Sequence, residues 1–505
     1  MLLTIFDWYR RLDNTTDDSD VGWNLERWWY RLIQVCQVWR YIILSYPTLL
    51  DLHLVCTYGT PVEAMLNHSP PFPLILYYPG KREAPGTISD EDKRGAIFAL
   101  RQRERVRRVH ITGPAASVRD LVGTMDDEYP TLQRLVIRSQ AEPRANPNRN
   151  RGASNAATVR LPAKLRAPLM RRLVLSNVAL PGGSSRLLSD ASENLGTLGL
   201  IDFPASPPDF DPAYLTAHLA MLSRLEMLTI YFGGAVPNRE VLRMLQGQGA
   251  RTTRRVVLPR LRILAYRGCS AYLDQGILVC FDAPSLRTLN VELFYQQTLS
   301  LPSLLKFVRA PVALKFLSAA LYFEKHLVSL IIDPLDKHTR GPGDTHPLHV
   351  QVKISALDWQ VPSITQICTA LAPLLARTES LTLGFHKDGP VTVVEVGAPA
   401  GWQGGDVVVD LVQWRALLRI FEGVKTLRVT GGHIGDLFRA LQPRHGEGND
   451  DGDGDGDGDV FALEVLPALE KLVPHGWGHT EDAFASLIAA READGRPVRL
   501  IRSRM

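Results

Sequence analysis

One short phrase recurs along this chain of 505 residues: Pro-x-Leu-x-x-Leu, continued by Val, Leu or Ile. The proline marks a turn, and the apolar residues after it alternate as they do in a strand that buries one face. A phrase repeated in this way indicates a repeat architecture, in which each unit places one strand beside the previous one. The clearest copies, one with Ser in place of Pro, occupy residues 129–137, 167–175, 222–230, 258–266, 283–291 and 466–473.

The phrase is close to the strand consensus of a leucine-rich repeat. Fainter copies occupy residues 50–55, 74–78, 106–111, 195–201, 378–383 and 424–429. The steps between copies exceed the ~20–29 residues of a regular leucine-rich repeat. We therefore expect degenerate units, some of them expanded or undetected.

Amphipathic helices are predicted between the strands, at residues 214–225, 240–245, 364–376, 410–421 and 482–491. Strand followed by helix, in units that cannot bury their own apolar faces, predicts an α/β fold. We expect an irregular leucine-rich-repeat solenoid of parallel strands plus helices over residues 48–505. Within it, the composition of four segments predicts exposed loops, at residues 141–158, 333–347, 387–405 and 446–459.

The N-terminal part of the chain has a different texture. From Asn24 to Leu44 apolar residues follow the i, i+3, i+4 spacing of one helical face, which predicts an amphipathic helix that Pro47 ends. A shorter apolar segment, residues 2–8, precedes it across the acidic residues 17–20. We expect a small all-α unit over residues 1–47, with a domain boundary near residue 47.

Two stretches of this unit resemble an F-box: Leu2-Leu3-Thr-Ile5-Phe6, and the phrase Val-Cys-x-x-Trp-Arg at residues 35–40. Residues 45–61 are similar to the junction in fungal F-box proteins with degenerate leucine-rich repeats, and residues 490–500 resemble the ends of such chains. The resemblance implies that the unit docks onto a Skp-type adaptor subunit. It also implies that the repeats hold an unknown protein substrate, which a cullin-RING ubiquitin ligase modifies.

The resemblance implies one set of partner-binding residues, which would dock through apolar helix-in-groove contacts: Leu2, Leu3, Ile5, Phe6, Leu32, Val35, Trp39 and Ile42. Some of these side chains must form the core of the unit, and the sequence does not separate the two roles. The alternative is a stand-alone leucine-rich-repeat scaffold that binds proteins without adaptor docking.

Composition limits the other function classes. The chain has 57 basic and 53 acidic residues, a net charge of +4, so no global field favours nucleic acid or an anionic membrane as a partner. The five cysteines are scattered and form no Cys-x-x-Cys pair, which disfavours a disulfide framework and a zinc site. No secretory signal and no apolar run of membrane-spanning length is found. We expect a cytoplasmic or nuclear protein.

The sequence contains no phosphate-binding loop, nucleophile elbow or zinc-protease motif, so we expect neither an enzyme nor a cofactor. A hydrolase or transferase would instead need a cleft assembled from distant polar groups. Residues 453–464 match the EF-hand loop pattern, but Pro467 interrupts the helix that should follow, which favours a plain Gly-Asp loop.

Two further patterns have simpler structural explanations. A cluster of arginines could contact phosphates, but the alternation around Val106 and Val109 favours a strand with a solvated basic face: Arg101, Arg103, Arg105, Arg107 and Arg108. His475 and His479 have the spacing of a helical metal pair, yet the glycines between them disfavour a helix and no third ligand is evident.

Overall fold

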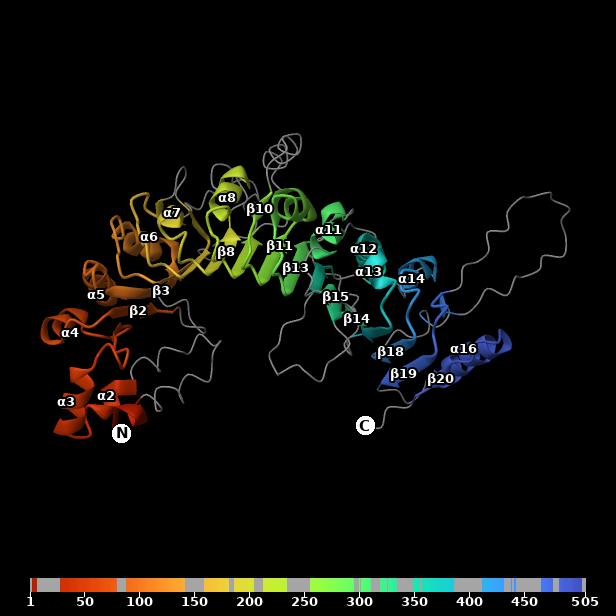
Figure 1. Ribbon diagram of the computed structural model, residues 1–505, viewed down its shortest axis with the longest axis horizontal. Helices are drawn as coiled ribbons and strands as arrows, with labels where there is room; N and C mark the ends of the chain where they lie inside the picture. The colour runs from red at the N-terminus through yellow and green to blue at the C-terminus, as the bar shows by residue number, and fades with distance from the viewer. Residues whose placement is uncertain are drawn as a thin grey trace. The chain divides into compact units, whose positions relative to one another are not determined.

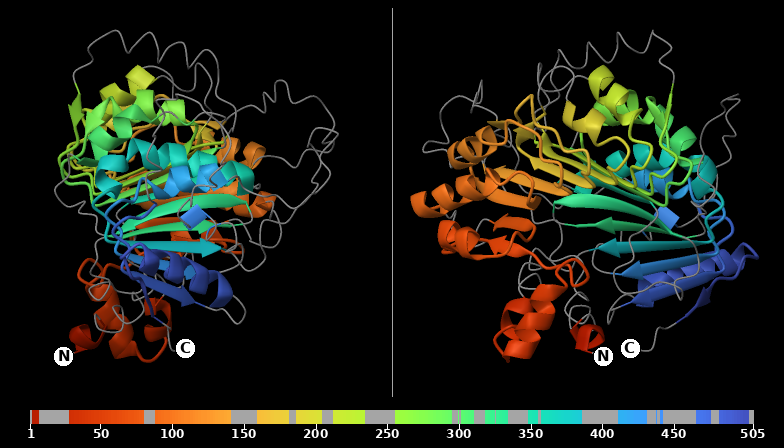
Figure 2. Two further views of the ribbon diagram at one scale, coloured as in Figure 1. Left: turned by 90° about the vertical axis from the view of Figure 1, so that its right-hand side faces the viewer. Right: turned by 60° about the vertical axis from the view of Figure 1, so that its left-hand side comes forward.

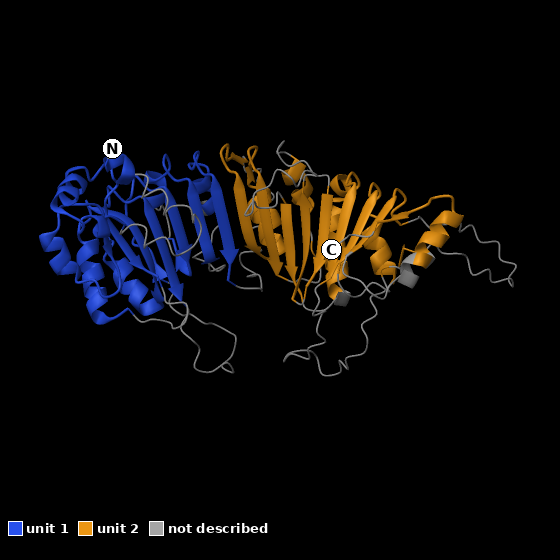
Figure 3. Cartoon of the chain, turned by 90° about the horizontal axis from the view of Figure 1, so that it is seen from below, with its two compact units in different colours: residues 1–234 blue, residues 235–505 orange. Residues whose placement is uncertain are grey.

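The chain forms two compact units, residues 1–234 and residues 235–505 (Figure 3). The computed structural model describes residues 2–6, 28–79, 88–140, 159–180, 186–203, 212–233, 255–294, 299, 301–309, 318–324, 326–333, 348–354, 357–385, 411–430, 437, 440–441, 465–475 and 481–501. Each unit combines a mainly parallel sheet with helices, so the predicted α/β class is confirmed.

In the first unit the strands pair in chain order, each parallel to the next (Figure 1): β1 (Leu54–Cys56), β2 (Leu74–Tyr78), β3 (Val106–Pro114), β4 (Arg134–Gln140), β6 (Arg172–Ser176), β8 (Thr197–Phe203) and β9 (Met227–Phe232). A short pair, β5 (Val159–Arg160) with β7 (Val178–Ala179), lies beside them. The connecting helices follow one face of the sheet (Figure 2): α4 (Val62–His68), α5 (Asp90–Leu100), α6 (Ala115–Gly123), α7 (Arg186–Asp190) and α8 (Pro212–Leu219).

In the second unit the strand order departs from the chain order. The sheet runs through β11 (Ile263–Gly268), β13 (Thr288–Phe294), β16 (Leu348–Lys353), β15 (Leu327–Asp333), β14 (Ser318–Phe323), β17 (Ser380–Phe385), β18 (Thr426–Thr430), β19 (Lys471–His475) and β20 (Arg499–Leu500). Strand β15 is antiparallel to both of its neighbours, and the other pairs are parallel.

Helices and two minor elements complete the second unit. The helices are α10 (Ser270–Leu273), α11 (Pro302–Arg309), α12 (Leu357–Ala370), α13 (Ala372–Leu375), α14 (Leu411–Leu418) and α16 (Glu481–Ala493). A π-helix, Asp274–Leu278, continues α10, and a short parallel pair joins β10 (Val256–Val257) to β12 (Phe281–Asp282). Helix α12 contacts β15 and β16, so it covers the part of the sheet where the strand order reverses.

The core of the first unit contains leucines stacked in cross-strand register. Leu135, Leu173, Leu198 and Leu228 are direct partners on successive strands, and all are fully buried. Burying one such side chain contributes roughly 1.5–3 kcal/mol. Because side chains alternate along a strand, the residues next to each of these leucines on its own strand point to the opposite face of the sheet.

In the copies of the phrase that contain proline, this residue begins a turn that leads into the following strand. The carbonyl before the proline accepts a hydrogen bond from the N–H three residues on: Leu132 to Tyr129 (3.2 Å), Met170 to Ala167 (3.1 Å), Leu286 to Ala283 (3.1 Å) and Leu469 to Leu466 (3.2 Å). This places the proline at the second position of a β-turn, where its fixed φ is favourable. The residue that closes the turn is buried in all four repeats; it is Met170 in one of them and a leucine in the other three.

The residue after this turn fixes the register of the strand in the next repeat. Its carbonyl accepts two consecutive N–H groups from the following strand, as Gln133 does from Arg171 (2.8 Å) and Arg172 (3.1 Å). Arg171 in turn accepts from Gly196 (2.9 Å) and Thr197 (3.0 Å). The same arrangement recurs in the second unit, where Lys425 accepts from residues 470 and 471. The repeated phrase therefore encodes a repeated backbone contact.

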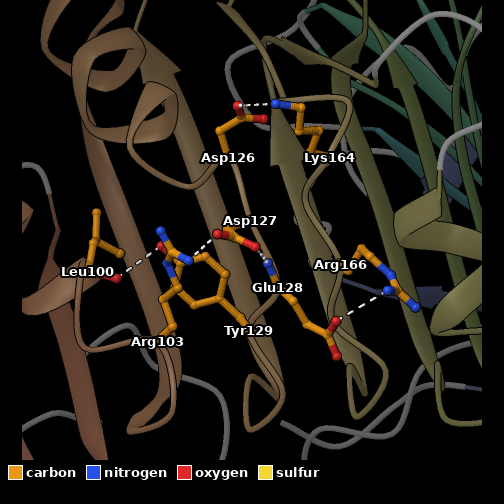
Figure 4. A network of polar contacts seen from close by, with 8 residues as sticks. All are labelled: Leu100, Arg103, Asp126, Asp127, Glu128, Tyr129, Lys164 and Arg166. Atoms are coloured by element: carbon orange, nitrogen blue, oxygen red, sulfur yellow. Dashed lines mark hydrogen bonds and ion pairs between the residues drawn. The ribbon is translucent and has the colours of Figure 1, made fainter.

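Charged side chains join the turns of neighbouring repeats within the first unit (Figure 4). The ion pairs are Arg103 with Asp127, Lys164 with Asp126 and Arg166 with Glu128. These partners are largely exposed, so each pair contributes little to stability. The buried hydroxyl of Tyr129 also donates to the Leu100 carbonyl at 3.0 Å, which ties a turn to the end of helix α5.

The predicted strands are confirmed, because a strand of the structure overlaps every copy of the phrase, clear or faint. Strands β14, β15 and β16 were not predicted. The predicted helices near 214, 364, 410 and 482 are present, and residues 240–245 lie outside the described residues. The predicted loops at 141–158, 387–405 and 446–459 also lie outside the described residues. Of the predicted loop at 333–347, only Asp333 is described, and it is the last residue of β15.

Two leucines four residues apart test the stacked core. We expect Leu173→Ala to destabilise the fold by about 2–5 kcal/mol, because it leaves a cavity in a fully buried row. Leu169→Ala, whose side chain is 45% exposed, should cost less than about 0.5 kcal/mol. Urea denaturation followed by circular dichroism compares them, and equal shifts of the two midpoints would contradict the assignment of Leu173 to the core.

Candidate protein-docking surface

The N-terminal segment is helical but broken. Residues 2–6 are helical, and α2 (Trp28–Leu32) and α3 (Gln37–Ser45) follow. The prediction of one continuous helix over residues 24–44 is therefore wrong within the described residues. Cys36 is extended (φ −159°, ψ 168°), and its Sγ accepts from the Trp39 N–H at 3.4 Å. It thereby starts a new helix, because it satisfies one of the N–H groups that lack a partner within that helix.

Aromatic side chains anchor this segment to the strands. Trp29 is 3% exposed, its Nε1 donates to the His53 carbonyl at 3.2 Å, and its ring packs edge-on against Phe72 at 5.8 Å. Phe6 is fully buried and packs edge-on against Trp39 at 5.1 Å. The helical segment is thus attached to the first strands of its own unit.

The structure separates the predicted docking residues by exposure. Phe6 is buried, so it belongs to the core of the segment. Ile5 (45%) and Val35 (59%) are exposed to solvent. The remaining predicted residues are half-buried: Leu2, Leu3, Leu32, Trp39 and Ile42. Burial therefore supplies the division between core and surface that the periodicity of the sequence could not.

Four exposed apolar residues of this segment were not predicted as docking residues: Val38 (60%), Tyr41 (74%), Tyr46 (48%) and Leu49 (61%). Val38 and Tyr41 lie three residues apart on α3, and Ile43, the buried residue of that helix, faces elsewhere. The sequence signal for Val38 and Tyr41 was their i, i+3 spacing, which runs next to the i, i+3 pair of Trp39 and Ile42. It was hidden because six of the nine residues of α3 are apolar and they occur on more than one side of the helix.

Exposed apolar side chains are concentrated in this segment. Six of the thirteen large apolar residues that are exposed within the described parts of the chain lie between residues 5 and 49. We call these six the N-terminal apolar set: Ile5, Val35, Val38, Tyr41, Tyr46 and Leu49. Apolar side chains that gather at the surface mark sites of macromolecular contact, since water gains from their removal. The segment therefore has the composition of a docking surface.

A polar cluster lies directly behind this segment. Arg107 Nη1 donates to Asp51 Oδ1 (2.6 Å) and lies 2.9 Å from His53 Nε2, while its Nε donates to Gln133 Oε1 (3.2 Å). Asp51 has a φ of 52°, in the left-handed region that aspartate tolerates better than most residues. The cluster connects the chain that follows α3 with strand β3 and the turn before β4.

Burial sets the protonation of this cluster. Desolvation lowers the pKa of His53 to about 4, although nearby Asp51 acts in the opposite direction. Burial tends to raise the pKa of Asp51, but His53 and Arg107 together lower it below its ordinary value. At neutral pH the imidazole is uncharged, so its Nε2 can accept from the Arg107 guanidinium.

The other sequence candidates have structural roles or lie outside the described residues. Strand β3, which starts at Val106, confirms the predicted strand, and Arg105 donates to the carbonyls of Phe72 and Pro70 at 3.1 Å. Residues 453–464 and His479 lie outside the described parts of the chain, and His475 ends β19. All five cysteines are free thiols.

The described residues provide neither a metal-ligand cluster nor a membrane-spanning helix. Among them, no group of three or more His, Cys, Asp or Glu side chains could hold a metal ion. None of the helices in these parts of the chain has the length and apolarity needed to span a membrane.

Comparison with known proteins adds no relative: no protein-family model matches the chain, and no curated protein matches it. The candidate surface therefore depends on the residues and contacts given above.

His53 predicts a pH dependence of stability. The folded state holds its pKa near 4 while the unfolded value is 6.5, so its contribution is complete above pH 6.5 and is lost as the pH falls towards 4. The loss amounts to about 3 kcal/mol. In His53→Gln, which keeps an acceptor for Arg107, urea denaturation at pH 7.5 and pH 4.5 should show a smaller loss than in the wild type. An unchanged difference between the two pH values would disprove the role of His53.

Proposed function

We propose that this chain is an F-box-like substrate-recognition adaptor of a cullin-RING ubiquitin ligase. Its N-terminal helical unit, residues 1–47, binds a Skp-type adaptor subunit. The observation that supports this most directly is the exposure of the N-terminal apolar set. Ile5, Val38 and Tyr41 of this set lie on short helices and the other three residues lie in the turns that follow helices, while Trp29 and Phe6 anchor the segment through buried contacts.

The rest of the chain, residues 48–505, is proposed to be an irregular leucine-rich-repeat solenoid that binds the target protein. The copies of the phrase, the recurring turn and the parallel pairing within each unit support this proposal. A repeat array suits this task because it presents a long surface from which many side chains reach one partner.

On this proposal the chain acts by holding two proteins and carries out no chemistry of its own. It uses no cofactor, and its partners are proteins rather than nucleic acid or membrane. The compartment is cytoplasmic or nuclear, where five free cysteines stay reduced. Ubiquitin transfer is performed by the attached ligase, and the chain raises the local concentration of the target.

Val38 and Tyr41 are expected to contribute most to docking. They are highly exposed, they lie three residues apart on one helix, and neither serves the core of the segment. Fully burying a side chain of valine size in a groove of the adaptor contributes about 1.5–3 kcal/mol. Two such contacts on one helix face are enough to alter an affinity by orders of magnitude.

Co-purification of the full chain with a Skp-type adaptor tests the proposal. The wild type should retain the adaptor, and Val38→Asp combined with Tyr41→Asp should lose it, because two carboxylates would have to be desolvated in an apolar groove. The matched control is Val257→Asp, at a valine that is 57% exposed in the second unit, and it should retain the adaptor.

Failure of the folded wild-type chain to retain any Skp-type adaptor would reject adaptor docking. That result would favour the alternative, a stand-alone repeat scaffold that binds proteins by itself. Retention of the adaptor by the α3 variant would instead show that the contact lies elsewhere.

A further inference from the structure

Three basic residues lie close together on the last strands of the second unit: Arg428 on β18, Lys471 on β19 and Arg499 on β20. Lys471 is the direct cross-strand partner of Arg499. Arg428 lies one strand away from Lys471 and two residues further along, so their Cα atoms are about 8 Å apart. We call these three residues the C-terminal basic cluster.

The C-terminal basic cluster points away from the helix that covers these strands. Helix α14 packs on the opposite face, where its Trp414 contacts the ring of Phe385 on β17, with 6.0 Å between the ring centroids. Buried Leu427 on β18 and Leu472 on β19 belong to that same face. Because side chains alternate along a strand, the residues of the cluster, which lie next to such leucines, point to the other side.

The three side chains of the cluster are exposed to solvent, and within the described parts of the chain none has a side-chain ion pair or hydrogen bond. Other basic residues of this unit are engaged: Lys425 pairs with Glu379 at 3.3 Å, and Lys353 pairs with Glu292 at 2.7 Å. Like charges on neighbouring strands repel each other. An anionic partner would relieve this repulsion, so the cluster favours one.

The surroundings of the cluster are neutral. The residues that share its face on β17, β18 and β20, with those of β19 up to Val473, are Ser380, Thr382, Gly384, Thr426, Thr430 and Val473. None of them is acidic, and none is aromatic. Single-stranded nucleic acid binds through bases that stack on aromatic rings among basic residues. Carboxylates need only the charges and the N–H groups, which guanidinium can offer as two parallel hydrogen bonds, so they fit this face better.

The spacing of the cluster suits an extended peptide. Alternate side chains of an extended chain lie on one side and are about 7 Å apart, which is close to the separation of Arg428 and Lys471. An extended segment with an acidic residue at every second position can therefore present one carboxylate to each of them. Arg499, beside Lys471, can share the second carboxylate or bind a third.

We propose that the C-terminal basic cluster binds an acidic, extended segment of a partner protein. The inference rests on the proposed function only in identifying that partner as the target for ubiquitination. Binding should weaken as the salt concentration rises, because the contacts are ionic and lie at the surface.

Fluorescence anisotropy with the full chain tests this inference. The probe is a labelled peptide in which Asp or Glu alternates with Ser or Thr, compared with the same peptide carrying Asn and Gln at the acidic positions. The wild type should prefer the acidic peptide, and Lys471→Glu combined with Arg499→Glu should weaken its binding by about tenfold or more. Arg428→Gln alone should give a smaller loss, and it covers the case in which the double variant fails to fold.

The control carries the same charge change on the helix side of the same unit. It combines Lys306→Glu with Arg309→Glu, both at exposed residues of α11, and it should bind as the wild type does. Equal weakening in this control, equal affinity for the neutral peptide, or tighter binding of a labelled single-stranded oligonucleotide would overturn the inference.

An acidic run of the chain itself is the competing occupant. Residues 447–459, between β18 and β19 in the sequence, contain one glutamate and six aspartates. A variant with Gln and Asn at these seven positions separates the two occupants. The wild type should bind the acidic peptide without this change, and binding by the variant alone would assign the cluster to the chain's own run and contradict the proposal.

The result is separable from adaptor docking. The cluster variants should retain the Skp-type adaptor, and the Val38→Asp, Tyr41→Asp variant should still bind the acidic peptide. A wild-type chain that binds the acidic peptide but no Skp-type adaptor would reject the proposed function and leave this inference standing. Circular dichroism checks the fold of each variant.

Discussion

The backbone turn before the strands of the repeated phrase is the interaction on which the structure depends. Its proline sets one dihedral angle, its closing residue enters the core, and the next carbonyl accepts two N–H groups from the following unit. Because that contact fixes where each strand begins, the leucines at positions 135, 173, 198 and 228 align in one row. The same register aligns Arg108, Arg134 and Arg172 on the opposite face of the sheet, so the packing of the core and the order of side chains on that face have one common cause.

A second constraint joins the N-terminal helices to this sheet. Trp29 donates to the carbonyl of His53, and the side chain of His53 lies beside Arg107, which also binds Asp51 and Gln133. The neutral imidazole makes this arrangement possible, since a charged one would face the guanidinium. The exposed apolar residues of α3 are therefore carried by a segment that is anchored through buried contacts, as a surface that docks another protein requires.

By itself the sequence determined the α/β class and the place of its repeated strands, because the phrase combines a turn former with alternating apolar residues, which are local signals. Tertiary structure decided the rest. Strands β14 to β16 lack the phrase and pair out of chain order, and the break before α3 depends on the Cys36 cap. Phe6 and Val35 look alike as apolar helical residues, yet one is buried and the other is exposed. Exposure depends on what packs against a side chain from distant parts of the chain, which no local pattern records.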